Sequence, residues 1–217
     1  NPSGRLQETF PLSIKHTPHY KFFPQELNAD YTNDIVRNGY RYYDTHDYDV
    51  LYPFGYGLSY SDVEYTSVDI SDIKENQVKI SVKLTNKSSM DAQEVVQIYV
   101  KNHMTELVMP EHTLKAFKKV MVPANESVMF TLLLDKDAFE TYDVQSKKFE
   151  IFNTDYTIEV ARNSKDIVDK KTVTIHNQKT FKLNVDLNFP LNAFVKYYPE
   201  IANAFIAKYR PLKWYDL

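Results

Sequence analysis

The stretch VKISVKLT, residues 78–85, decides the fold class because apolar and polar side chains alternate along it without a break. Successive side chains of a β-strand point to opposite faces, whereas a helix repeats every three to four residues. The pattern therefore predicts a strand with one apolar face and one face of lysine and serine. The apolar set is Val78, Ile80, Val82 and Leu84.

The same alternation extends in both directions, from about residue 65 to residue 176. Turn signals at TNKSSMD, VPANES and VQSKK separate the candidate strands. Seven or eight short strands, with a turn about every 8 to 12 residues, predict an all-β sandwich of the immunoglobulin-like type. FETYD, residues 139–143, is a candidate for its tyrosine corner. The further strand candidates are EVVQIYV, LKAFKKVMV, SVMFTLLL, KFEIF, YTIEVA and KTVTI.

The two ends of the chain differ from this middle part. Residues 1–57 are rich in proline, aspartate and tyrosine and have no periodic stretch long enough to make a core, so we expect an extended segment that does not fold by itself. From residue 187 apolar residues recur at steps of three and four, which predicts an amphipathic helical tail interrupted at Pro199 and ended at Pro211. The predicted organisation is 1–57, 58–176 and 177–217.

Composition excludes several classes of partner and site. The 26 basic and 29 acidic residues leave a net charge of −3, which argues against a nucleic-acid partner. The absence of cysteine excludes disulfides, zinc thiolate sites and cysteine nucleophiles. No apolar run reaches the roughly 18 residues needed to cross a bilayer, so we expect a soluble protein without a membrane partner. The compartment stays open between cytoplasm and secretion, with the cytoplasm slightly favoured.

Three sequence blocks resemble glycoside hydrolase family 3, the β-glucosidase and β-xylosidase family. NPSGRLQETFP, residues 1–11, is similar to the family's Asn-Pro-Ser-Gly block, with Gln7 where a proline is usual. NGYRYYDTHDYDVLYPFGYGLSY, residues 38–60, is similar to its Gly-Tyr-Arg-Tyr-Tyr-Asp and Pro-Phe-Gly-x-Gly-Leu-Ser-Tyr blocks. The stretches NKSSMDAQEVVQIYV, LKAFKKV and VPANESVMFTL resemble its fibronectin type III-like domain, with Asn125 where glycine is usual.

The resemblance implies that this chain is one part of a larger enzyme and that another part carries the catalytic residues. Residues 1–57 would be the last segment and linker of an α/β sandwich domain, and residues 58–176 the fibronectin type III-like domain. Both carboxylates of the retaining mechanism would lie upstream of Asn1. We therefore assign no catalytic, cofactor-binding or metal-binding residue here and expect no cofactor. The expected function is a non-catalytic scaffold of a β-glucosidase that hydrolyses terminal non-reducing β-D-glucosyl residues.

The expected partner is the N-terminal catalytic part of the same enzyme, either covalently attached or as a separate chain. The apolar residues of the first 57 positions could also pair two copies of the chain. The alternative function is a stand-alone carbohydrate-binding or adhesion module of immunoglobulin-like fold.

The aromatic residues near the end of the first segment are the candidate functional residues. Aromatic faces can stack on sugar rings, but tyrosine also fills domain interfaces, because its large apolar ring carries a hydroxyl that stays hydrogen-bonded. Interface packing is the favoured interpretation and sugar contact the alternative. The candidates are Tyr40, Arg41, Tyr42, Tyr43, Phe54 and Tyr56.

Other motifs carry weaker signals. His16 and His19 have the spacing of a metal pair, but Pro18 prevents a regular helix between them, so a surface loop is favoured. Ser61-Asp62 and Ser71-Asp72 do not match the family's nucleophile motif and are interpreted as turn or strand-edge residues. Asn86 and Asn125 each begin a glycosylation sequon, a pattern that also occurs by chance.

Overall fold

The computed structural model describes residues 1–18, 20, 38–105, 107–143, 146–176, 178 and 180. The chain divides into two compact units, Asn1–Phe181 and Lys182–Leu217. The predicted helical tail from residue 187 lies outside the described residues, as does His19.

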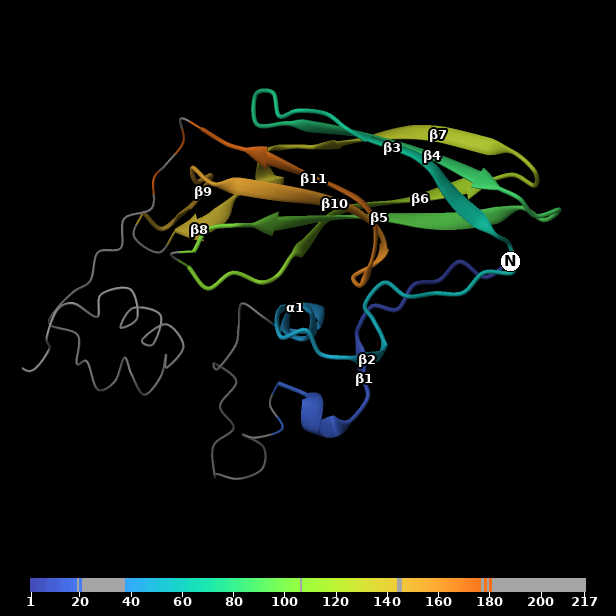
Figure 1. Ribbon diagram of the computed structural model, residues 1–217, viewed down its shortest axis with the longest axis horizontal. Helices are drawn as coiled ribbons and strands as arrows, with labels where there is room; N and C mark the ends of the chain where they lie inside the picture. The colour runs from blue at the N-terminus through green and yellow to red at the C-terminus, as the bar shows by residue number, and fades with distance from the viewer. Residues whose placement is uncertain are drawn as a thin grey trace, which may run out of the picture. The chain divides into compact units, whose positions relative to one another are not determined.

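Two antiparallel sheets form a β-sandwich, which confirms the predicted fold class (Figure 1). One sheet has the order β11-β10-β5-β6 and the other the order β3-β4-β7. The short strands β8 and β9 form a separate hairpin. The strands are β3 (Val63–Ile70), β4 (Val78–Asn86), β5 (Ala92–Asn102), β6 (Thr113–Val122), β7 (Ser127–Leu134), β8 (Thr141–Asp143), β9 (Lys148–Glu150), β10 (Asp155–Asn163) and β11 (Asp166–Thr174).

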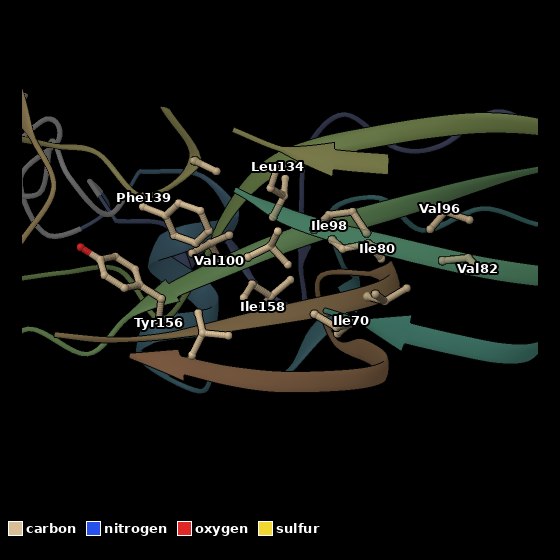
Figure 2. Packing of buried hydrophobic residues seen from close by; sticks show 14 of the residues in the cluster. Ile70, Ile80, Val82, Val96, Ile98, Val100, Leu134, Phe139, Tyr156 and Ile158 are labelled. Atoms are coloured by element: carbon tan, nitrogen blue, oxygen red, sulfur yellow. The ribbon is translucent and has the colours of Figure 1, made fainter. Parts of the chain in front are cut away.

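The core lies between the two sheets and is made by the side chains that the alternation placed inward (Figure 2). On β4, Ile80 pairs with Leu132 of β7 and Val82 pairs with Phe130, so the apolar faces of neighbouring strands are in register. Burying each such side chain is worth about 1.5–3 kcal/mol. The fully buried members include Val78, Ile80, Val82, Leu84, Val96, Ile98, Ile158 and Val160.

The tyrosine corner is not in residues 139–143, so that prediction was wrong. Tyr142 is 49% exposed and packs edge-on against Phe149 in the β8–β9 hairpin. Tyr156, at the start of β10, is buried instead, and its hydroxyl donates to the carbonyl oxygen of Phe152 at 3.2 Å. The Phe152 amide donates back to the same hydroxyl at 3.3 Å. A tyrosine that bonds to the backbone a few residues upstream is the corner of this type of sandwich.

The described residues of the first segment form short elements. These are β1 (Phe10–Pro11), the 3₁₀ helix η1 (Ile14–His16), helix α1 (Tyr40–Thr45) and β2 (Val50–Tyr52). Strands β1 and β2 pair with each other in an antiparallel ribbon. A second 3₁₀ helix, η3 (Lys136–Ala138), follows β7. The stretch YPFGYGLSY begins in β2 and then leads by turns toward β3.

Strand β10 is buried on both faces, which strict alternation does not predict. Ile158 and Val160 face the core, and Thr157, Glu159 and Ala161 on the other face are buried as well. A strand of an antiparallel sandwich usually has one face in water. Something must therefore cover the outer face of β10. His103 and His112 contact Thr157 and Glu159 there, and the first segment is hydrogen-bonded to the same side of the sheet at Gln97 and Ser164.

Candidate functional site

The site is the joint at which described parts of the first segment, among them helix α1 and the loop after β2, lie on the outer face of the four-stranded sheet. The Gln97 side-chain amide on β5 donates to the carbonyl oxygen of Gly55 at 3.1 Å and to that of Arg162 at 2.6 Å. The Ser164 amide, after β10, donates to the carbonyl oxygen of Phe54 at 3.0 Å. The loop after β2 is thus hydrogen-bonded through its backbone to β5 and to the β10–β11 turn.

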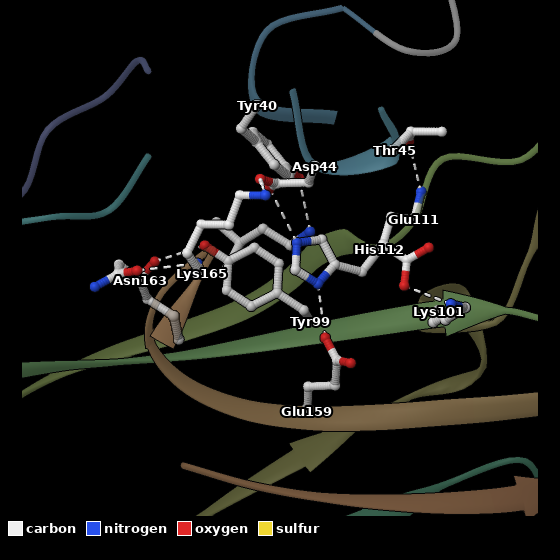
Figure 3. A network of polar contacts seen from close by, with 12 residues as sticks. Tyr40, Asp44, Thr45, Tyr99, Lys101, Glu111, His112, Glu159, Asn163 and Lys165 are labelled. Carbon is white, nitrogen blue, oxygen red and sulfur yellow. Dashed lines mark hydrogen bonds and ion pairs between the residues drawn. The ribbon is translucent and has the colours of Figure 1, made fainter. Parts of the chain in front are cut away.

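His112 stands at the centre of the joint, directly before β6 (Figure 3). Its Nδ1 atom lies 2.6 Å from the Glu159 carboxylate on β10. Its Nε2 atom lies 3.2 Å from the Asp44 carboxylate on helix α1. The residue is only 4% exposed. The imidazole therefore links helix α1 to the sandwich in a site with little access to water.

The pKa of His112 reflects two opposing influences. Burial favours the neutral ring and lowers the pKa, but the hydrogen bonds to Asp44 and Glu159 and the charges of both carboxylates outweigh burial. Together they raise the pKa of His112 from 6.5 to about 9. At neutral pH the ring is therefore a cation between two carboxylates.

Further groups complete this network. The Lys165 ammonium lies 3.5 Å from the carboxylates of Asp44 and of Asp47. The Tyr99 ring stacks on His112 with centroids 4.5 Å apart, and its hydroxyl donates to the Gln97 side chain at 2.7 Å. Tyr99 thereby connects the ionic centre to the amide that holds Gly55.

Three of the predicted aromatic residues lie buried or half-buried in or beside the joint. Tyr40 stacks on Phe54 with centroids 4.5 Å apart, and its hydroxyl accepts a hydrogen bond from the Leu114 amide at 2.8 Å. Tyr43 is buried, and burial raises the pKa of its phenol. These rings are occupied by protein contacts.

The other three predicted residues have neighbours within the first segment. Tyr42 packs against Tyr43 and His46, and Tyr56 packs against Tyr52 with centroids 5.1 Å apart. The Arg41 guanidinium lies over the Tyr40 ring at 5.7 Å, and its Nε atom has no hydrogen-bond partner among the described residues.

A second attachment point lies nearer the start of the chain. The Arg5 guanidinium makes an ion pair with Glu94 on β5 at 2.8 Å, and the two side chains are 13% and 9% exposed. The Tyr65 hydroxyl lies 3.4 Å from the other Glu94 oxygen. Asn1 donates to the Ser61 hydroxyl at 2.6 Å and accepts from the Tyr60 amide at 3.0 Å.

The weaker sequence candidates have structural contacts. The Ser61 hydroxyl donates to the carbonyl oxygen of Met90, and Asp72 pairs with Lys171 at 2.8 Å. The Asn86 amide is buried and donates to two carbonyl oxygens, so this sequon is closed in the folded chain. His16 stacks on Tyr48. In the described ranges no cluster of three or more histidine or acidic side chains is arranged to hold a metal ion.

Comparisons with known proteins agree with this architecture. Residues 94–164 match the family model of the fibronectin type III-like domain. Thermostable β-glucosidase B of Acetivibrio thermocellus is 40% identical over 191 residues, which cover 85% of this chain and 25% of that protein. The crystal structure of a GH3 β-glucosidase from Bifidobacterium adolescentis superimposes with a TM-score of 0.76 at 33% identity, over 94% of this chain and 30% of that one.

The chain belongs to glycoside hydrolase family 3. Within the family it matches the C-terminal region. This family 3 chain spans about a quarter of the length of the curated relatives it matches. An exo-α-(1→6)-L-arabinopyranosidase of Bifidobacterium breve is also similar, at 37% identity over 81% of this chain and 23% of that protein. Among the described residues of the family 3 chain, no helix has the length and apolar character needed to cross a membrane.

Sequence reasoning missed the ionic centre of the joint. His112 stands alone in the sequence, and Asp44 and Glu159 are 68 and 47 residues away from it. The alternation of YTIEVA does place Glu159 on the outer face, but it predicts contact with water. Only the covering segment turns these positions into a buried site.

Proposed function

We propose that this chain is the structural support of a β-glucosidase and that its first segment connects the β-sandwich to the catalytic part. The observation that carries the proposal is the two-sided character of residues 1–57. One side is fixed to the sandwich through Arg5, Gly55 and Asp44. The other side exposes large apolar residues. The division into 1–57, 58–176 and 177–217 is part of this proposal.

The exposed side of the first segment is apolar, as expected for a surface that another polypeptide covers. Five large apolar side chains on or next to β1, η1 and β2 are between 41% and 71% exposed, which is unusual for neighbouring residues of a short ribbon. They are Phe10, Leu12, Ile14, Leu51 and Tyr52. We infer that the upstream polypeptide of the parent protein covers this ribbon.

The parent enzyme would hydrolyse terminal non-reducing β-D-glucosyl residues without a cofactor. Relatives that are named β-glucosidases support this substrate class. Retaining hydrolysis needs two carboxyl groups about 5–5.5 Å apart, and the upstream polypeptide would supply both. The residues of this chain would position that polypeptide and would not touch the sugar.

Reconstitution tests the proposal directly. This chain is mixed with the purified upstream polypeptide of its parent, and hydrolysis of a nitrophenyl β-D-glucoside is measured. We expect complex formation and activity that neither part shows alone. Leu51→Asp should weaken the complex at least tenfold, because it places a charge in the covered ribbon. Met129→Asp is the matched control, since Met129 is 68% exposed on β7, outside the first segment.

A complex that forms yet stays inactive would contradict the proposal, and so would an equal effect of both variants. Calorimetry of this chain alone with cello-oligosaccharides should show no heat up to millimolar concentration. Saturable binding that is lost in Tyr42→Ala or Tyr56→Ala would instead support the carbohydrate-binding module. Sedimentation would report whether the uncovered ribbon pairs two copies.

A further inference from the structure

His112 connects two parts of the fold through two carboxylates. Asp44 belongs to helix α1 in the first segment, and Glu159 belongs to strand β10 in the sandwich (Figure 3). The contact with Glu159 is 2.6 Å long and that with Asp44 is 3.2 Å long. The ring thus has one short contact inside the sandwich and one longer contact across the joint.

Both contacts together need a proton on each ring nitrogen. A neutral imidazole has one N–H donor and one lone pair, so it can donate to only one of the two carboxylates. The other carboxylate would then face a lone pair in a buried site, where an unpaired polar group is unfavourable. Because the Glu159 contact is the shorter one, loss of a ring proton should break the Asp44 contact.

The surrounding groups do not replace the lost proton. Lys165 already faces two carboxylates of the first segment, at 3.5 Å each. Glu111 is paired with Lys101, and the neighbouring tyrosines present their rings to His112. The groups around the imidazole and its partners are Tyr40, Asp44 and Asp47 on the first segment, Tyr99 and Lys101 on β5, Glu111 before β6, Glu159 on β10 and Lys165 after β10.

We propose that His112 is a proton-operated latch, which tightens the attachment of helix α1 to the sandwich when its ring is charged and loosens it when the ring is neutral. The hydrogen bonds from the Leu114 amide to Tyr40 and from the Glu111 amide to Thr45 do not depend on this proton and keep α1 attached at its two ends. The raised pKa of the His112 ring determines how the attachment of α1 depends on pH. The latch is closed below the ordinary histidine pKa of 6.5 and is lost as the pH rises through about 9. Between these values the closing equilibrium constant should fall about tenfold per pH unit.

The consequence of the latch for catalysis rests on the proposed function, because α1 would then transmit the loosening toward the catalytic part. The latch itself is a property of this chain. Its tests therefore use the 217-residue polypeptide alone, and they can fail or succeed independently of the reconstitution experiment.

The first experiment follows the ring and the helix separately by NMR between pH 6 and 10. The His112 ring resonances should titrate near pH 9. Hydrogen-exchange protection factors of the α1 amides should fall at least tenfold over the same range, including the His46 amide that donates to Tyr42. Amides of β4, in the middle of its sheet, should keep their protection.

Variants separate the latch from a general effect of alkaline solution. His112→Lys keeps a positive charge to higher pH and should make α1 protection independent of pH up to about 9.5. Asp44→Asn removes the partner across the joint, and should lower the pKa of His112 and abolish the step in α1 protection. His103→Gln is the matched control, because His103 is exposed beside the same sheet and contacts Thr157.

Three results would overturn the latch. They are a His112 ring that titrates at or below pH 6.5, an α1 protection that does not change between pH 6 and 10, and a step of unchanged size in Asp44→Asn. The first of these needs only the unmodified chain, so the proposal stays testable even if a variant fails to fold.

Discussion

At the scale of single residues, the joint depends on Gly55, a position at which no side chain fits. Gly55 has a φ of 82°, which is a left-handed conformation that favours glycine. A methyl group built on it would overlap the side-chain amide of Gln97. The glycine-rich stretch after β2 is therefore required for close approach of its backbone to β5.

Gly55→Ala should lower the free energy of unfolding by about 2 kcal/mol or more, because it adds strain at positive φ and displaces a buried amide. Urea denaturation gives the difference. Gly4→Ala is the control, since nothing lies within 4 Å of the added methyl group, and it should change stability by less than about 0.5 kcal/mol. Equal effects of the two substitutions would contradict the close-approach argument.

The Arg5–Glu94 pair gives a second prediction at this scale. Arg5→Met should lower the free energy of unfolding by about 2–4 kcal/mol, because it leaves the Glu94 carboxylate buried without a cation. Lys87→Met is the matched control, since the Lys87–Glu64 pair is largely exposed and such pairs contribute about 0–1 kcal/mol. A loss of less than about 1 kcal/mol in Arg5→Met would show that water reaches Glu94.

Asn125 stands in place of a glycine at the turn between β6 and β7. It has a φ of 56° at the point where the resembling family usually has glycine. Asparagine tolerates the left-handed region better than most residues, so the β6–β7 turn keeps its shape. The substitution needs no change elsewhere in the fold, because the required conformation is local.

At the scale of elements, the strands were predictable and the helix was not. Alternation in β4 and β7 fixes which side chains meet in the core, since each strand has one buried face. Helix α1 has only six residues and starts after Gly39 at a φ of 62°, so it has no apolar period to detect. Its position is set by contacts with β5, β6 and β10, which no local pattern contains.

The tyrosine corner of β10 can be tested by removing one oxygen. Tyr156→Phe should lower the free energy of unfolding by about 1–3 kcal/mol, because the buried backbone of Phe152 loses its partner hydroxyl. Tyr142→Phe, in the exposed position first assigned to the corner, should be neutral within about 0.5 kcal/mol. The reverse order of the two effects would restore the original assignment.

At the scale of the whole molecule, the first segment is a part of the sandwich surface. It contacts Tyr99 and Gln97 directly and reaches Glu159 by way of His112, and these side chains would otherwise lie on the solvent side of the sheet. The fold class could be predicted because it rests on repeated local patterns. The joint could not, because its ion pairs and hydrogen bonds connect residues at least 40 positions apart in the sequence.

The stability of the whole unit should depend on pH in the range where His112 titrates. A folded-state pKa raised from 6.5 to about 9 contributes on the order of 3 kcal/mol, which is present below pH 6.5 and lost as the pH rises through 9. Thermal unfolding at pH 6 and pH 9 should show a lower midpoint at pH 9. The same difference in His112→Gln would mean that other groups cause the alkaline loss.

The distance between Arg5 and Glu94 along the chain has a consequence for biosynthesis. Ribosomes add about 5–20 residues per second, so Glu94 emerges roughly 5–20 seconds after Arg5, and Glu159 later still. During that interval the side of the first segment that contacts the sandwich has no sheet to lie on, and it stays open to other chains. Chaperone demand during translation of this chain should therefore concentrate on the sheet-facing side of the first segment.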